Sequence, residues 1–269
     1  MVTLPLTLQI YDESGKGTVT LSKAGSGLYY LLTFSAPPDN RLTPEMCFTL
    51  QHALDIVEDE LLLVQKLPLV TTSGIEKFYS NGLNLELAKS TRGFWDDSFY
   101  PVLKRFLQFP TACIAVVNGH AFAGGFMMAM CHDYRIMNPS RGFLCLNEIE
   151  FGAPLKAPMS GIFRHKLTPA VYQKIVLEAT RFTADLAIAN HIIDAKGSLE
   201  DADEFIKARK LHKYCQSPAY GALKSEMWRD IIHFCDSPFE YEEKLMQESE
   251  NIDEKRKKLR YSKVVNSKL

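Results

Sequence analysis

Two apolar segments separated by glycines follow one another between residues 112 and 131. The first, Ala112 to Val117, has the length of a buried strand, and Asn118-Gly119 ends it. Ala123-Gly124-Gly125 comes next, and Phe126 to Cys131 then has a length compatible with a helix. A strand that runs through glycines into a helix leaves backbone N–H groups without partners at the helix N-terminus. Because the helix dipole is positive there, the sequence predicts a site for an anion or a developing oxyanion.

A carboxylate follows this segment. Two further apolar runs, Asp133 to Met137 and Phe143 to Leu146, predict a pair of strands joined by the turn at 138–142. Glu148 comes directly after the second run. On chemistry alone, the glycines serve either an oxyanion site or only close strand–helix packing. Glu148 is correspondingly either a catalytic base or a solvated loop residue.

Three separated motifs carry a resemblance to a known family. NGHAFAGGFMMAMCHDYRI begins at Asn118, FLCLNEIEFG begins at Phe143, and FYSNGLNL spans 78–85. Together they resemble the crotonase superfamily, the enoyl-CoA hydratases and isomerases, over about residues 5 to 200. The resemblance implies an α/β fold, a spiral of ββα turns at 1–197. It also implies a C-terminal helical region at 198–269 that serves trimer packing, so a homotrimer or homohexamer is expected.

Local patterns along the chain agree with that fold. Strands are predicted at Val19–Leu21 and Leu28–Phe34, and another at Leu67–Thr71. Between them Thr43 is the expected N-cap and Pro44 the first residue of a helix. After Gly152, helices are expected at about 160–166, 169–179 and 183–190, and most of 198–260 is expected to be helical.

The resemblance assigns roles to individual residues. The family binds acyl-CoA thioesters and holds the thioester oxygen with two backbone N–H groups as it becomes an enolate. Carried over, these donors are Asn81 and Gly124. Further substrate contacts are expected from these residues: Ser80, Gly82, Leu83, Gly125, Met127, Trp95 and Phe99. Ala123 stands where the family has its first glycine.

The expected reaction depends on the carboxylates. The hydratases that the chain resembles use two glutamates, and Met127 occupies the first of those positions while Glu148 occupies the second. A thioether cannot move a proton or activate a water molecule. A single base, however, can move a proton from the α-carbon to the γ-carbon of an acyl-CoA. The pattern therefore resembles the 3,2-enoyl-CoA isomerases, most of all their peroxisomal branch, and the substrate belongs to unsaturated fatty-acid β-oxidation.

Alternatives remain open at this point. Glu150 is a less favoured base, and His120 and His132 are interpreted as structural. A hydratase, a dienoyl-CoA isomerase, a CoA hydrolase and a non-catalytic CoA-binding subunit are the competing functions. Met127 argues against the hydratase. Glu148, together with both expected oxyanion positions, argues against the non-catalytic subunit.

Composition excludes several other classes. The net charge of −1 gives no electrostatic reason for binding nucleic acid, and no apolar run approaches the ~20 residues of a membrane span. The six cysteines have no metal-ligand spacing, so buried free thiols are expected, with no metal and no cofactor beyond the CoA of the substrate. The chain ends in Ser267-Lys268-Leu269, the tripeptide read by the peroxisomal import receptor, which predicts a peroxisomal location.

Overall fold

The computed structural model describes residues 2–11, 16–237 and 252. Apart from Ile252, residues 238–260 of the expected helical region and the terminal tripeptide 267–269 lie outside the described residues. The boundary proposed between residues 197 and 198 stays a prediction.

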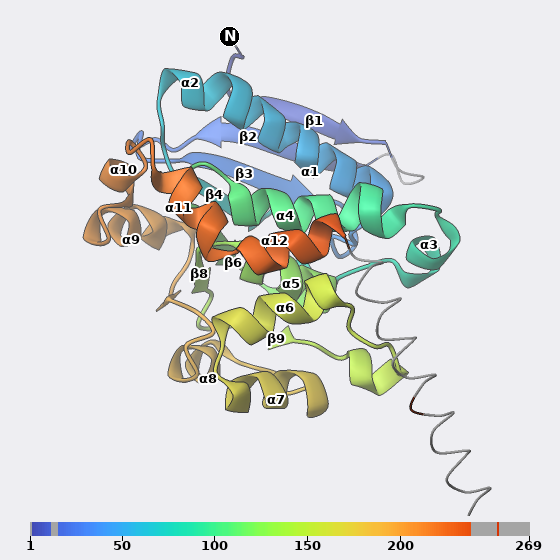
Figure 1. The fold of residues 1–269 in the computed structure, drawn as a ribbon. Helices are drawn as coiled ribbons and strands as arrows, with labels where there is room; N and C mark the ends of the chain where they lie inside the picture. Colours follow the sequence, from blue (N-terminus) through green and yellow to red (C-terminus); the bar gives the residue numbers. More distant parts are fainter. Residues whose placement is uncertain (1, 12–15, 238–251, 253–269) are drawn as a thin grey trace, which may run out of the picture.

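Two sheets organise the chain (Figure 1). The larger has seven strands in the order β1-β2-β3-β4-β6-β8-β10, and the smaller has three in the order β5-β7-β9. The strands are β1 Leu6–Ile10, β2 Gly17–Lys23, β3 Tyr30–Ser35, β4 Leu69–Ser73, β5 Phe78–Ser80, β6 Cys113–Val117, β7 His120–Phe122, β8 Tyr134–Met137, β9 Leu144–Cys145 and β10 Ala195–Lys196.

Helices connect and cover the strands. They are α1 Pro44–Ile56, α2 Leu62–Val64, α3 Leu85–Ser90, α4 Tyr100–Gln108, α5 Gly124–Cys131, α6 Ala157–Lys166, α7 Pro169–Leu177, α8 Ala184–Ala189, α9 Ala202–Ala208, α10 Leu211–Tyr214, α11 Tyr220–Met227 and α12 Arg229–Asp236. Val57–Leu61 and Phe94–Phe99 are π-helical, and Glu148–Phe151 and Leu199–Asp201 are 3-10 turns. The expected start of α1 is confirmed, because the Thr43 hydroxyl accepts from the Met46 N–H and Pro44 is the first helical residue.

From β4 onward, consecutive strands alternate between the two sheets. After β4 in the large sheet comes β5 in the small one, and the pairs β6–β7 and β8–β9 repeat this step. Each pair is followed by a helix, so the chain advances as the expected spiral of ββα turns. The prediction that Asp133–Met137 and Phe143–Leu146 pair with each other is wrong. β8 pairs with β6 and β10, and β9 pairs with β7, because each strand joins the preceding turn of the spiral.

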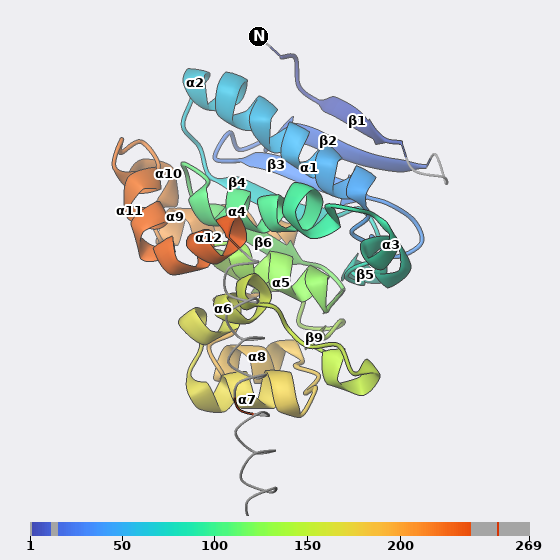
Figure 2. The same ribbon diagram turned by 45° about the vertical axis from the view of Figure 1, so that its right-hand side comes forward.

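The core has two parts, one on each face of the large sheet. Leu69, Cys113 and Val117 face a cluster that α1, α4 and α5 help to form, whereas Val70 and Ile114 face a smaller one with residues of α9 and α10. Strands buried on both faces explain the unbroken apolar runs. Figure 2 shows the spiral from the side, with α6, α7 and α8 below α5.

Candidate active site

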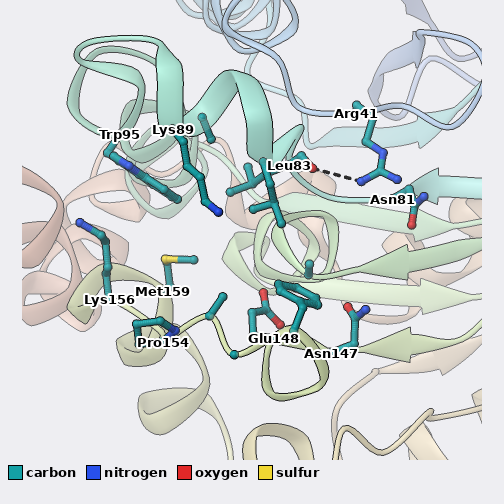
Figure 3. Close-up of a pocket in the computed structure, with 16 residues that line it drawn as sticks. Arg41, Asn81, Leu83, Lys89, Trp95, Asn147, Glu148, Pro154, Lys156 and Met159 are labelled. Atoms are coloured by element: carbon teal, nitrogen blue, oxygen red, sulfur yellow. Dashed lines mark hydrogen bonds between the residues drawn. The ribbon is translucent and has the colours of Figure 1, made fainter.

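A cavity of about 420 Å³ lies where the small sheet, α3 and α6 meet (Figure 3). Its lining comes from segments far apart in the sequence: Arg41, Asn81, Leu83, Leu85, Ala88, Lys89, Trp95, Ala123, Asn147, Glu148, Phe151, Gly152, Ala153, Pro154, Lys156 and Met159. Glu148 is the only carboxylate among them. In the part of the chain that the structure describes, the cavity therefore combines a largely apolar wall with a single acidic group.

Helix α5 begins at one wall of this cavity. Ala123 lines the cavity and has a positive φ of 48°, which turns the chain from β7 into the helix that begins at Gly124. Among the hydrogen bonds of the described residues, none engages the Gly124 N–H, as expected for a first helical residue. The other end of α5 is held by Lys166, whose ammonium donates to the His132 carbonyl at 2.8 Å. The helix thus presents an unpaired N–H next to the cavity.

The first oxyanion loop corrects one prediction. The Asn81 N–H donates to the Asp39 carbonyl at 2.9 Å, so it is not available to hold a thioester oxygen. Asn81 still lines the cavity, but its side-chain amide also binds Asp39, with Nδ2 donating to Oδ2 at 2.6 Å. The assignment of Asn81 as a backbone donor is therefore wrong.

Leu83, two residues later, has the geometry that Asn81 lacks. Leu42 forms a parallel bridge with Leu83 and donates its N–H to the Gly82 carbonyl at 2.8 Å. In a parallel pairing of this kind, Leu42 bonds to the residues on either side of Leu83, and the N–H of Leu83 points the other way. Leu83 lines the cavity, and a Cβ added to Gly124 would lie 3.0 Å from its Cγ. Neither N–H has a hydrogen-bond partner among the described residues, so the two candidate donors belong to neighbouring segments.

Gly82 allows this close approach. Its φ is +80°, and an added Cβ would lie 2.8 Å from the Phe122 carbonyl oxygen and 3.0 Å from the Gly124 nitrogen. Only glycine has neither a steric cost at this φ nor a side chain to keep the two loops apart.

We expect Gly82→Ala to destabilise the fold by ~2 kcal/mol or more, since the left-handed conformation alone costs about 1–2 kcal/mol. The matched control is Gly25→Ala, where an added Cβ has no atom within 4 Å. Urea unfolding of both variants measures the difference. Equal midpoints for the two variants would contradict the close approach of the loops.

Glu148 begins the 3-10 turn after β9 and is 7% exposed. Its Oε2 has no hydrogen-bond partner among the described residues. Burial raises the pKa of this carboxyl from 4.5 to about 7, and a backbone hydrogen bond within the residue opposes the rise. Glu150 lies on the same turn but is exposed and does not line the cavity. Glu148 is thus the carboxyl placed to exchange protons at neutral pH.

The other expected substrate contacts divide into two groups. Leu83 and Trp95 line the cavity, whereas Ser80, Gly82, Gly125, Met127 and Phe99 do not. The Ser80 hydroxyl accepts from the Gly82 N–H and donates to the Asn40 carbonyl. A Cβ added to Gly125 would lie 2.6 Å from the Cβ of Ser80, so the two residues are in close contact. Met127 and Phe99 are fully buried; the Phe99 ring packs edge-on against Trp95. These residues support the wall and do not form it.

Three basic residues at the cavity were not identified from the sequence: Arg41, Lys89 and Lys156. Arg41 follows β3, Lys89 lies in α3 and Lys156 precedes α6, so only the fold brings them together. No local spacing would have found them. Basic side chains around a cavity suit an anionic ligand.

His120 and His132, the two histidines considered above, do not line the cavity, which is consistent with structural roles. His132 is fully buried, stacks on Phe106 at 4.1 Å and bonds Thr71 and the Met128 carbonyl. Burial lowers its pKa. The His120 ring stacks on Phe122 and makes a tilted contact with Phe143, and burial also lowers its pKa.

Within the described ranges, all six cysteines are free and buried, as expected, and no cluster of His, Cys, Asp or Glu side chains could hold a metal ion. None of the helices in that part of the chain is long and apolar enough to cross a membrane.

Comparisons with known proteins identify the family. The model of the enoyl-CoA hydratase/isomerase family matches residues 25–260. The chain belongs to this family. An Arabidopsis thaliana protein named enoyl-CoA delta isomerase 3 is 31% identical over 234 residues, covering 81% of this chain and 94% of that protein. Another from the same plant, named peroxisomal enoyl-CoA delta isomerase 1, is 28% identical over 211 residues, covering 76% and 87%.

Solved structures confirm the crotonase fold. The crystal structure of a probable enoyl-CoA hydratase, EchA3, from Mycobacterium tuberculosis superposes with a TM-score of 0.71 at 20% identity, covering 87% of this chain and 98% of that one. Similarity at this identity concerns the fold alone. Together with the family match, it makes this protein a crotonase-family acyl-CoA enzyme.

Proposed function

We propose that the protein converts 3-enoyl-CoA to trans-2-enoyl-CoA, as an acyl-CoA double-bond isomerase. The observation that carries the proposal is that Glu148 is the single carboxylate among the described residues that line the cavity. Met127, at the position where the hydratases that the chain resembles have the first of their two glutamates, is buried and does not reach that lining.

The proposed reaction uses two backbone donors and one base. The N–H groups of Leu83 and Gly124 hold the thioester oxygen. Glu148 removes the α-proton, the electron pair moves onto that oxygen, and a dienolate forms. The same carboxyl then returns the proton to the γ-carbon, and the double bond moves from the β,γ to the α,β position. Donors fixed in advance where charge develops give about 10²–10³ in rate each.

The basic residues support an anionic carrier on the acyl group. Arg41, Lys89 and Lys156 line the cavity together with apolar side chains such as Trp95 and Met159. CoA carries phosphate groups, which pair with arginine and lysine, and its acyl chain suits an apolar wall. No cofactor is needed beyond the CoA of the substrate.

A direct assay tests the reaction class. The protein is incubated separately with 3-enoyl-CoA and with 2-enoyl-CoA, and the products are identified by mass and absorbance. We expect isomerisation of the first and little hydration of the second. Hydration of 2-enoyl-CoA without isomerisation would make the protein a hydratase and would contradict the proposal.

The rate is expected to depend on pH through the base. Glu148 acts as a base only when ionised, and burial raises its pKa to about 7. Because kcat/KM reports the ionisation of the free enzyme, we expect kcat/KM to rise with pH through about 7 and to level off above it. A rate profile between pH 5 and 9 measures this. A profile that is flat through neutral pH would contradict the assignment of Glu148.

We also propose a peroxisomal location, supported by the terminal Ser267-Lys268-Leu269 and by the names of two plant relatives. Removing these three residues is expected to leave catalysis intact and to release the protein into the cytosol. Microscopy in cells without the full-length copy measures this, and unchanged punctate peroxisomal localisation would refute it. Assembly as a homotrimer or homohexamer stays a prediction.

A further inference from the structure

The segment Asp39–Leu42, between β3 and α1, runs beside the oxyanion loop Phe78–Leu83 and is bonded to it along its length. We propose that Asn40 in this segment is a positioning residue that fixes where the Leu83 N–H points. The proposal rests on the proposed function, in which that N–H holds the thioester oxygen.

Asn40 is fully buried and has a positive φ of 53°. Its Oδ1 accepts from the Ala36 N–H at 2.6 Å, and its Nδ2 donates to Ser73 Oγ at 2.7 Å and to the Tyr79 carbonyl at 3.0 Å. Nδ2 also donates to the Phe78 carbonyl, at a distance of 3.4 Å. One side chain thus joins the ends of β3 and β4 to β5, where the oxyanion loop begins.

The backbone around Asn40 binds the next residues of the loop. Ser80 Oγ donates to the Asn40 carbonyl at 2.7 Å, and the Asn81 N–H donates to the Asp39 carbonyl at 2.9 Å. The left-handed conformation of Asn40 presents consecutive carbonyls and a side chain to the same loop. Asparagine tolerates this conformation better than most residues. The free-energy cost of this backbone conformation is consistent with a functional segment that its surroundings hold in place.

The last contacts reach Leu83 itself. The Leu42 N–H donates to the Gly82 carbonyl at 2.8 Å, and Arg41 Nη1 donates to the Leu83 carbonyl at 3.1 Å. Figure 3 shows the Arg41 contact at the edge of the cavity. Arg41 is held in turn by the Asp39 carboxylate at 3.1 Å. The loop is therefore anchored from Phe78 to Leu83, with the Leu83 N–H turned away from the segment.

This anchoring matters because an oxyanion donor works only at a fixed place. A misplacement of about 1 Å costs on the order of 10²-fold in rate. Asn40 is not one of the residues that line the cavity, so its side chain can affect catalysis only through the loop. Removing its side chain is expected to weaken enolate stabilisation more than ground-state binding.

The test variant is Asn40→Gly, because glycine keeps the positive φ without strain and removes only the side-chain bonds. The probe is acetoacetyl-CoA, whose bound enolate is detected by its ultraviolet absorbance. We expect kcat to fall about 10–100-fold, and the pKa of the bound probe to rise by about one unit for each tenfold loss of enolate stabilisation. The Kd of a saturated acyl-CoA, measured by calorimetry, is expected to change less than threefold, roughly.

The matched control is Tyr30→Phe. Its hydroxyl donates to the Leu61 and Gln65 carbonyls, and the residue is buried but does not line the cavity. It removes buried hydrogen bonds as Asn40→Gly does, and it should lower the melting temperature without moving the pKa of the bound probe. A merely structural Asn40 would behave like this control.

If Asn40→Gly does not fold, Ser80→Ala decides, because it removes the hydroxyl that bonds both the Asn40 carbonyl and the Gly82 N–H. An unchanged pKa of the bound probe in a folded variant overturns the proposal. This result is distinguishable from failure of the proposed function. An absence of 3-enoyl-CoA turnover by the parent protein refutes the isomerase, whereas the probe reports on the oxyanion site of any crotonase-family enzyme.

Discussion

Glu148→Gln is expected to lower isomerase kcat by about 10²–10⁴-fold, the range that one proton-transfer group commonly contributes. Glutamine has nearly the same shape but cannot accept the α-proton and return it. Since no other carboxylate of the described residues lines the cavity, none of them replaces it. The measurement is the rate of 2-enoyl-CoA formation from 3-enoyl-CoA.

The matched control is Glu150→Gln, on the same 3-10 turn but exposed, which is expected to retain the parent rate. If Glu148→Gln retains more than about a tenth of the parent rate, the single-base mechanism fails. Met127→Glu restores the second carboxylate of the resembled hydratases. Because Met127 is fully buried outside the cavity lining, we expect this change to cost stability and to give little hydration.

Glu148→Gln is expected to lower kcat, but it is also expected to raise the stability of the fold at high pH. The carboxyl ionises at a pH near 4.5 when exposed and near 7 in the fold, so the folded chain binds more protons between these values. Stability contributed by this group therefore falls as pH rises through that window. At pH 8 the variant is expected to be more stable by up to about 3 kcal/mol, and at pH 4 the advantage disappears. Thermal unfolding at both pH values checks the sign. Activity lost together with stability at pH 8 would indicate misfolding.

Gly124→Pro is expected to lower kcat by about 10²–10³-fold, because it removes one oxyanion N–H. Proline is tolerated at the first position of a helix, where the N–H has no intrahelical partner. The residue before a proline is restricted, and Ala123 already has a positive φ, so the fold of the variant must be checked by circular dichroism. The measurement is again turnover of 3-enoyl-CoA.

Gly124→Ala is the matched control. It keeps the N–H but places a Cβ 3.0 Å from Leu83 and 3.4 Å from Phe99. We expect a smaller loss than for proline, since the Leu83 side chain must move by a few tenths of an ångström. Near-parent turnover by the folded proline variant would show that Gly124 is not a donor. Equal losses in both variants would assign the effect to crowding.

Much of the fold follows from local sequence. Thr43-Pro44 caps α1 as expected because an N-cap and a first-turn proline act within one helical turn. The apolar runs of β4 and β6 predict buried strands because both faces of the large sheet are covered. Gly124 and Gly125 predict the turn into the helix because glycines between two apolar segments interrupt regular structure locally.

The partners of these elements were decided only by the tertiary structure. β8 and β9 are neighbours in sequence but lie in different sheets, since each pairs with the preceding turn of the spiral. Short strands such as β7 have too few residues to show a pattern, and they were missed.

The site shows the same division. The sequence singled out Glu148, and the fold supplied the burial that raises its pKa. The family resemblance placed the first donor at Asn81, but the Asp39 carbonyl, 42 positions earlier in the chain, engages that N–H and leaves Leu83 to face the cavity. A motif determines which residues are near a site. Which backbone group is free depends on hydrogen-bond partners brought from elsewhere in the chain, and only folding brings them.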